Sequence, residues 1–192
     1  MKTFITLASS LFLSACSVFG HQSVEIAPYD ILRSDNAFEV RYYEQMMLVT
    51  TPMTTGDDTS SSFYKLFNYI SGENGTAAEI SMTAPVFMDK TGDADNEMSF
   101  VLPANFTFEN APVPNDPDVM LEEVKDYTVA TIQFNGRLTQ KAIKTNTDAL
   151  KSWIIQNEYE ITGAPKAAGY NAPFTLPMFR RNEILIPITY NE

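Results

Sequence analysis

The sequence predicts an α+β fold, in which two helices lie on one side of a mostly antiparallel, curved sheet. Most β-prone segments are short and either apolar or alternating, whereas two segments show apolar residues at helical spacing. The stretch 80–103 is also echoed near the C-terminus by the stretch 169–187. Two copies of one supersecondary unit, each consisting of strand, helix, strand and strand, explain this pattern.

The N-terminal segment predicts export. Lys2 gives a short basic start, residues 4–13 are largely apolar but too few to span a bilayer, and Ser14-Ala15 supplies the small residues of a cleavage site. Together with Leu13 and Cys16 this pair resembles a bacterial lipobox, in which the cysteine is lipidated and becomes the mature N-terminus. An ordinary signal peptide followed by a chance cysteine is the alternative.

These signals divide the chain into three parts. We expect a signal peptide over residues 1–15, a lipidated tether and lead-in over residues 16–31, and a single domain over residues 32–192. Within the domain the two pseudo-repeats cover about 38–103 and 119–188. Cys16 is the only cysteine, so the body can form no internal disulfide and hold no catalytic thiol.

Charge and composition exclude several classes of function. The chain has 24 acidic and 13 basic residues and a net charge of −11, which disfavours binding to nucleic acid or to anionic headgroups. His21 is the only histidine and lies in the expected tether, where a solvated linker residue is the simplest interpretation. A Ser-His-Asp set is therefore excluded from the body, and we expect no catalysis.

The first half predicts strands on either side of a short helix. Alternation favours a strand at 38–42, and β-prone residues continue it over 46–51. Phe63, Leu66, Phe67 and Ile70 then follow at helical spacing, and this helix should end at Ser71-Gly72. Two further strands, 80–88 and 98–102, are joined by a Gly- and Asp-rich turn.

The second half repeats this order with a stronger helix. The Pro-rich stretch 103–118 forms the joint, and strand material follows over 119–134, with a charged turn expected near Lys125-Asp126. The helix presents two neighbouring apolar rows, made of Ala142, Ala149 and Trp153 and of Ile143, Leu150 and Ile154. Ala172-Pro173 repeats Ala84-Pro85. We give both prolines a structural role, because proline has no N–H to donate and in a sheet is found at an edge or a bulge.

These segments together resemble the SOUL haem-binding protein family. The resemblance rests on 38–44, on Met-Thr-Ala-Pro-Val at 82–86 and on Arg-Arg-Asn-Glu at 180–183, and it covers roughly residues 24–188. It implies a distorted antiparallel β-barrel with two flanking helices and an internal pseudo-twofold, similar to the gyrase-inhibitor-like effector-binding fold. It further implies non-covalent binding of haem, a related tetrapyrrole or another apolar small molecule.

The resemblance also implies a ligand site between the first helix and the loop before the last strand. Matched onto this sequence, the ligand-binding residues are Phe63, Tyr64, Phe67, Asn68, Phe174, Met178, Phe179, Arg180 and Arg181. Aromatic side chains would contact the tetrapyrrole face, and the arginines would meet its carboxylates. No metal site is recognised, because the body has no histidine.

Several residue roles stay open at this point. Arg180 and Arg181 could hold carboxylates of a ligand, or they could begin a strand and pair with Glu183. The methionines could offer thioethers to iron or could simply fill the core; they are Met46, Met47, Met82, Met88, Met98 and Met178.

We therefore expect a bacterial lipoprotein that binds a tetrapyrrole-like ligand. The lipid on Cys16 would be its membrane attachment. Ser17 follows this cysteine, and by the common sorting rule the absence of Asp at that position implies the outer membrane, facing the periplasm. The alternative is a structural or protein-interaction lipoprotein that kept the SOUL fold without haem binding.

Overall fold

The computed structural model describes residues 24–53, 59–89 and 96–190. The expected signal peptide, Cys16 and His21 lie outside the described residues. No helix within the described ranges is long and apolar enough to cross a membrane.

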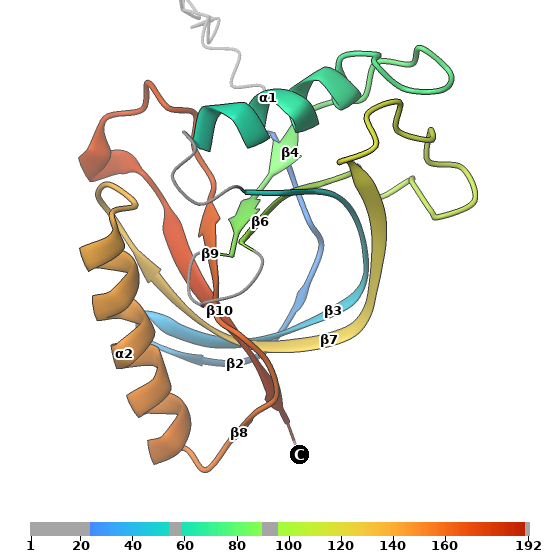
Figure 1. Cartoon of the computed structure of the whole chain (residues 1–192). Helices are drawn as coiled ribbons and strands as arrows, with labels where there is room; N and C mark the ends of the chain where they lie inside the picture. Colours follow the sequence, from blue (N-terminus) through green and yellow to red (C-terminus); the bar gives the residue numbers. More distant parts are fainter. Residues whose placement is uncertain (1–23, 54–58, 90–95, 191–192) are drawn as a thin grey trace, which may run out of the picture.

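Six strands of the described chain close into an antiparallel β-barrel, as Figure 1 shows. Around the ring they are β3 (Phe38–Pro52), β6 (Glu97–Val101), β5 (Val86–Met88), β9 (Lys166–Gly169), β10 (Asn182–Thr189) and β7 (Met120–Phe134). The long pairing of β3 with β7, from Phe38 opposite Ile132 to Thr50 opposite Met120, closes the ring. The predicted α+β class and barrel are confirmed.

Three shorter pairings extend the barrel. β1 (Glu25–Ile26) runs parallel to β4 (Thr83–Ala84), β2 (Asp30–Asp35) pairs with β3, and β8 (Glu160–Ile161) pairs with β10. Much of the segment 24–31, expected as a lead-in, is therefore paired with the body.

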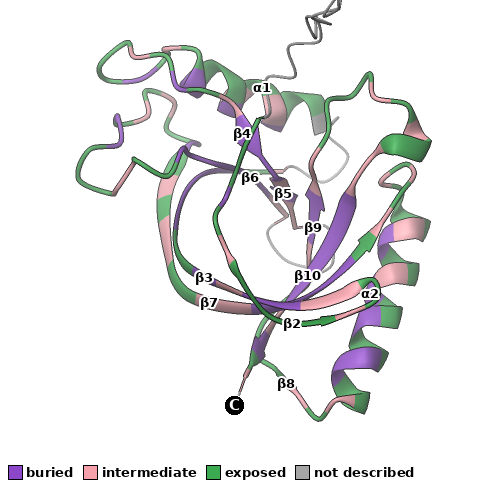
Figure 2. Ribbon diagram, turned by 180° about the vertical axis from the view of Figure 1, so that it is seen from behind, coloured by how far each residue is buried: buried purple, intermediate pink, exposed green. Residues whose placement is uncertain are grey.

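The two helices cover different parts of the barrel. α1 (Thr59–Ile70) lies across one end, and α2 (Gln140–Gln156) packs along the side against β7 and β10 (Figure 1). The Thr139 hydroxyl accepts a hydrogen bond from the Ala142 N–H and caps α2 at its start. Figure 2 shows the buried stripe of α2 turned toward the strands. That stripe contains Ile143, Leu150 and Ile154, as the periodicity predicts.

The structure corrects two details of the predicted strands. The chain does not turn at Lys125-Asp126: β7 runs straight through, and its register with β3 is the same on both sides of Asp126, where φ is 51°. The predicted strand 80–88 consists of β4 and β5 alone, separated by Pro85, which has no N–H for the ladder.

The sequence echo corresponds to two hairpins that meet at the centre of the sheet. β5 pairs with β6, β9 pairs with β10, and β5 pairs with β9, so the two units lie side by side. The repeated dipeptides are not equivalent, however. Ala84-Pro85 precedes the paired residues of β5, whereas Ala172-Pro173 follows β9.

Candidate functional site: an apolar groove under α1

α1 has one buried face and one face that remains available to a ligand. Leu66, Tyr69 and Ile70 are buried against the barrel, and the Tyr69 hydroxyl donates to the carbonyl of Pro112 at 2.8 Å. Phe63 is half-buried, with its ring centroid 5.1 Å from that of Phe100. Phe67 stacks on Phe63 and stays 43% exposed. The apolar spacing thus places aromatic side chains at the edge between helix and barrel.

A groove of about 550 Å³ lies along this edge. Its residues come from the start of the described chain, from α1, from β4, β5 and β6 with the residue before β4, and from the end of β9 with the chain that follows it. They are Val24, Ser60, Phe63, Tyr64, Phe67, Met82, Thr83, Ala84, Val86, Met88, Met98, Gly169, Tyr170, Asn171, Ala172 and Pro173. The volume falls in the range of about 300–1,000 Å³ that is usual for small-molecule sites.

The lining has the chemistry of a site for a flat apolar molecule. Within the described part of the chain, the groove residues include aromatic rings and methionines but no Lys, Arg, Asp, Glu or His. Met82, Met88 and Met98 supply thioethers, and Met98 is itself almost completely buried. An apolar ring that moves from water into this groove buries apolar surface, and it leaves few polar groups of the protein without a hydrogen-bond partner.

A buried ionic network lies directly behind one groove residue, Tyr170. The Tyr170 hydroxyl donates to Glu183 Oε2 at 2.8 Å. The Arg41 guanidinium donates to both oxygens of the same carboxylate, at 2.7 and 3.0 Å, and Arg181 Nε donates to Oε1 at 2.9 Å. Arg41 also donates to Glu39 at 2.7 Å. These contacts fix the position of Tyr170 at the edge of the groove.

The network keeps the Glu183 carboxylate charged although its side chain is fully buried. Burial alone would raise the pKa of Glu183, but the hydrogen bonds and positive charge of Arg41, assisted by Arg181, lower this pKa below its ordinary value. Burial, followed by the neighbouring Glu183 charge, raises the pKa of Tyr170, so its hydroxyl stays protonated and donates. The groove therefore presents a neutral surface.

The loop before β10 carries the other predicted ligand residues and holds them outward. Phe174, Met178 and Phe179 are 89%, 69% and 68% exposed and are not among the groove-lining residues. The last two lie in the short helix η1 (Pro177–Phe179). Arg180 turns its guanidinium back onto its own loop, where Nε donates to the carbonyl of Thr175 at 2.8 Å and another nitrogen donates to that of Pro173.

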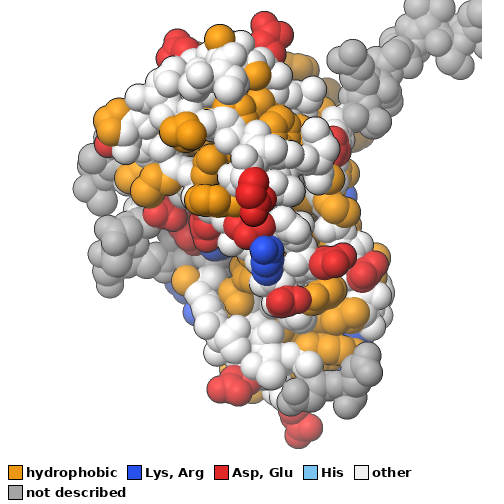
Figure 3. Space-filling view, turned by 90° about the vertical axis from the view of Figure 1, so that its right-hand side faces the viewer, with side chains coloured by type: hydrophobic (Ala, Val, Ile, Leu, Met, Phe, Trp, Pro, Cys, Tyr) orange, Lys and Arg blue, Asp and Glu red, His pale blue; other side chains and the backbone are white. Residues whose placement is uncertain are grey.

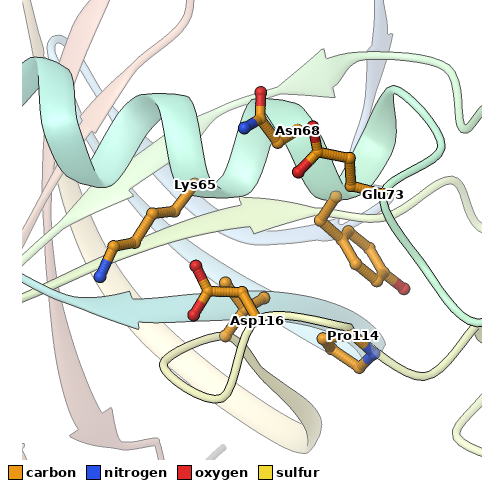
Figure 4. A pocket seen from close by; sticks show the side chains of 7 residues that line it. Lys65, Asn68, Glu73, Pro114 and Asp116 are labelled. Atoms are coloured by element: carbon orange, nitrogen blue, oxygen red, sulfur yellow. The ribbon is translucent and has the colours of Figure 1, made fainter.

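Asn68 is not among the residues that line the groove. It lines a small hollow with Lys65, Tyr69, Glu73 and Pro114, which Figure 4 shows together with Asp116. The structure thus brings Phe63, Tyr64 and Phe67 together in the groove and places Asn68 apart from them.

The structure also shows the surroundings of residues whose roles the sequence left open. Arg181 pairs with Glu183 and stacks over the Tyr170 ring, with 4.0 Å from its guanidinium carbon to the ring centroid. Met46 and Met47 are core residues. Within residues 24–53, 59–89 and 96–190, no group of three or more His, Cys, Asp or Glu side chains is placed to hold a metal ion.

Fold and site together define an α+β barrel domain with an open apolar groove. The crystal structure of the EcmrR C-terminal domain has the same fold, with a TM-score of 0.59 and 16% identity over 84% of this chain and 98% of that one. The family model described as SOUL heme-binding protein matches residues 24–187. The chain belongs to the SOUL heme-binding protein family.

Curated relatives agree with this assignment over most of the chain. Heme-binding protein 1 of Sus scrofa is 27% identical over 181 residues, covering 88% of this chain and 94% of that protein. Heme-binding protein 2 of Homo sapiens is 28% identical over 169 residues, covering 82% of this chain and 81% of that protein. Both relatives are named for heme binding and not for catalysis.

Proposed function

We propose that the protein binds haem or a related tetrapyrrole non-covalently in the groove under α1 and catalyses no reaction on it. The observation that supports this most strongly is the uncharged lining, in which Phe63, Tyr64 and Phe67 face the strand edge of a SOUL-family barrel. Flat aromatic ligands gain most of their binding free energy from such surfaces.

The groove-lining residues suit contact with the tetrapyrrole ring better than coordination of a metal at its centre. The rings of α1 would contact one part of the tetrapyrrole, and Met82, Val86 and Met88 would contact another. Bound haem would supply an iron centre, but the lining offers it thioethers and no imidazole among the described residues. Arg180 and Arg181 are engaged within the protein, so the ligand's carboxylates would lie at the open side of the groove, in water.

This arrangement predicts binding that does not depend on iron. Titration of the purified protein with haemin and with metal-free protoporphyrin IX should give saturable Soret shifts with Kd values equal within a factor of about three. Saturation by haemin alone, with loss of the shift in Met82→Leu, would indicate iron coordination instead. Absence of a saturable shift with either ligand would contradict the proposed function.

Because Arg180 and Arg181 already bond within the protein, they also support a second candidate function. A structural or protein-interaction lipoprotein would keep the barrel and the Arg41–Glu183 network without needing a cation at the groove. The same titration separates the two, because this candidate predicts no saturable binding of either porphyrin.

We further propose that the protein is lipidated at Cys16 and sits in the outer membrane of a Gram-negative envelope, facing the periplasm. The support is the sequence Leu13-Ser14-Ala15-Cys16 and the serine that follows it. Cells grown with an alkyne analogue of palmitate should label the protein, and Cys16→Ala should lose the label. Label that persists in this variant would place the lipid elsewhere.

A further inference from the structure

The loop between β9 and β10 exposes large apolar side chains to an unusual degree. Phe174 is 89% exposed, Met178 69%, Phe179 68% and Leu176 59%. α1 adds Tyr64 at 62% and Phe67 at 43%. We call these six residues the apolar end. The start of the loop, Asn171 to Pro173, lines the same groove as Tyr64 and Phe67. Exposed apolar side chains that gather at one end of a molecule mark contacts with a membrane or another molecule.

Hydrogen bonds hold the loop in this arrangement. Arg180 donates to the carbonyls of Pro173 and Thr175, and the Arg181 N–H donates to Asn171 Oδ1 at 2.6 Å. The Gly136 N–H donates to the carbonyl of Pro177 at 2.9 Å, which ties the loop to the chain that follows β7. The loop is therefore built to present its apolar side chains outward.

The outward-facing part of this loop is uncharged. Residues 171–179 contain no charged residue, although the chain has a net charge of −11. The Lys65 ammonium of α1 pairs with Asp118 at 2.6 Å and so adds no unpaired charge there. Acidic side chains are spread over the face shown in Figure 3, from its upper end to its lower end. A neutral, apolar surface on an acidic protein fits a neutral, apolar partner.

We propose that the apolar end rests on the surface of a lipid bilayer, with its aromatic and aliphatic side chains in the interfacial region. In Figure 1 the loop and α1 lie at the same end of the barrel. The described chain also starts there, because Val24 lines the groove.

The expected tether is short enough to impose this orientation. Seven residues lie between Cys16 and Val24, and the eight steps from one to the other span at most about 28 Å when fully extended. A lipid on Cys16 would therefore keep the apolar end close to the bilayer. This step rests on the proposed lipidation, whereas the exposed loop does not.

The orientation has a consequence for the ligand, and this consequence rests on the proposed tetrapyrrole binding. Tyr64 and Phe67 belong both to the groove and to the apolar end. The groove thus opens toward the bilayer, and an apolar ligand passes between lipid and groove with little exposure to water.

A fluorescent probe at one position tests the contact. With Cys16 lipidated, Met178→Cys introduces the only free thiol, which is labelled with nitrobenzoxadiazole on protein purified from membranes and placed in phosphatidylcholine vesicles. Ile155→Cys is the matched control, because Ile155 is 70% exposed and lies near the C-terminal end of α2, and α2 ends at the far end of the barrel from α1 (Figure 1). We expect blue-shifted emission and quenching by doxyl-labelled lipid at position 178 and neither effect at position 155.

The contrary outcomes are distinct. Equal emission at both positions overturns the proposal. So does a shift at position 178 that grows with protein density and is insensitive to doxyl lipid, since this indicates contact with a second copy. If Cys16 proves not to be lipidated, the same probes in a Cys16→Ala background with added vesicles still test the surface, and loss of the shift at position 178 overturns it.

Discussion

Replacing Arg41 by methionine is expected to lower the free energy of unfolding by about 3–5 kcal/mol. Arg41 is 2% exposed, and its guanidinium donates to both oxygens of the fully buried Glu183. Methionine fills much of the same volume but leaves this carboxylate with fewer donors in a site without water access. Urea denaturation at neutral pH, followed by circular dichroism, measures the loss.

The control for this prediction is an ion pair on the surface. Lys144 pairs with Asp148 at 2.7 Å on α2, and both side chains are more than half exposed. Lys144→Met removes the same kind of charge, and we expect it to leave the midpoint nearly unchanged because exposed pairs contribute little. Equal effects of the two substitutions would show that the buried network does not stabilise the fold.

The network illustrates what the sequence could not show. The alternation of residues along β3 predicts to which face of the strand the Arg41 side chain points. It does not predict which residues cover that face. In the structure, Val40 and Arg41 are both buried, and the Arg41 guanidinium carbon lies 4.4 Å from the centroid of the Tyr29 ring. Arg41 and Glu183 are 142 residues apart and meet only because the ring of strands closes. Pairing of Arg181 with Glu183 could be foreseen, since Arg181 directly precedes β10 and residues two apart in an extended chain point to the same face.

Elements defined by local spacing were predicted well. The apolar rows of α2 and the end of α1 at Ile70 follow from periodicity and from Ser71-Gly72, which act within a few residues. The site was harder to predict. Phe63 and Phe67 reach the groove because their spacing fixes one helix face, whereas the direction of Phe174, Met178 and Phe179 depends on how Arg180 folds the loop back.

A charge placed on one face of α1 should abolish most ligand binding, while the same charge on the adjacent residue should not. Phe67→Asp removes an aromatic contact from the groove and puts a carboxylate beside the ligand ring. We expect the Kd for protoporphyrin IX to rise by about tenfold or more, since burying one aromatic side chain is worth about 1.5–3 kcal/mol. Soret titration gives the two constants.

Asn68→Asp is the matched control, because it adds the same charge one residue further along α1. Asn68 faces the hollow near Lys65 and Glu73 and not the groove. We expect its Kd to match that of the unmodified protein, with both variants keeping the barrel's circular dichroism spectrum. If Asn68→Asp weakened binding as much as Phe67→Asp, the ligand would have to contact the hollow beside Lys65 as well, and the groove would be the wrong site.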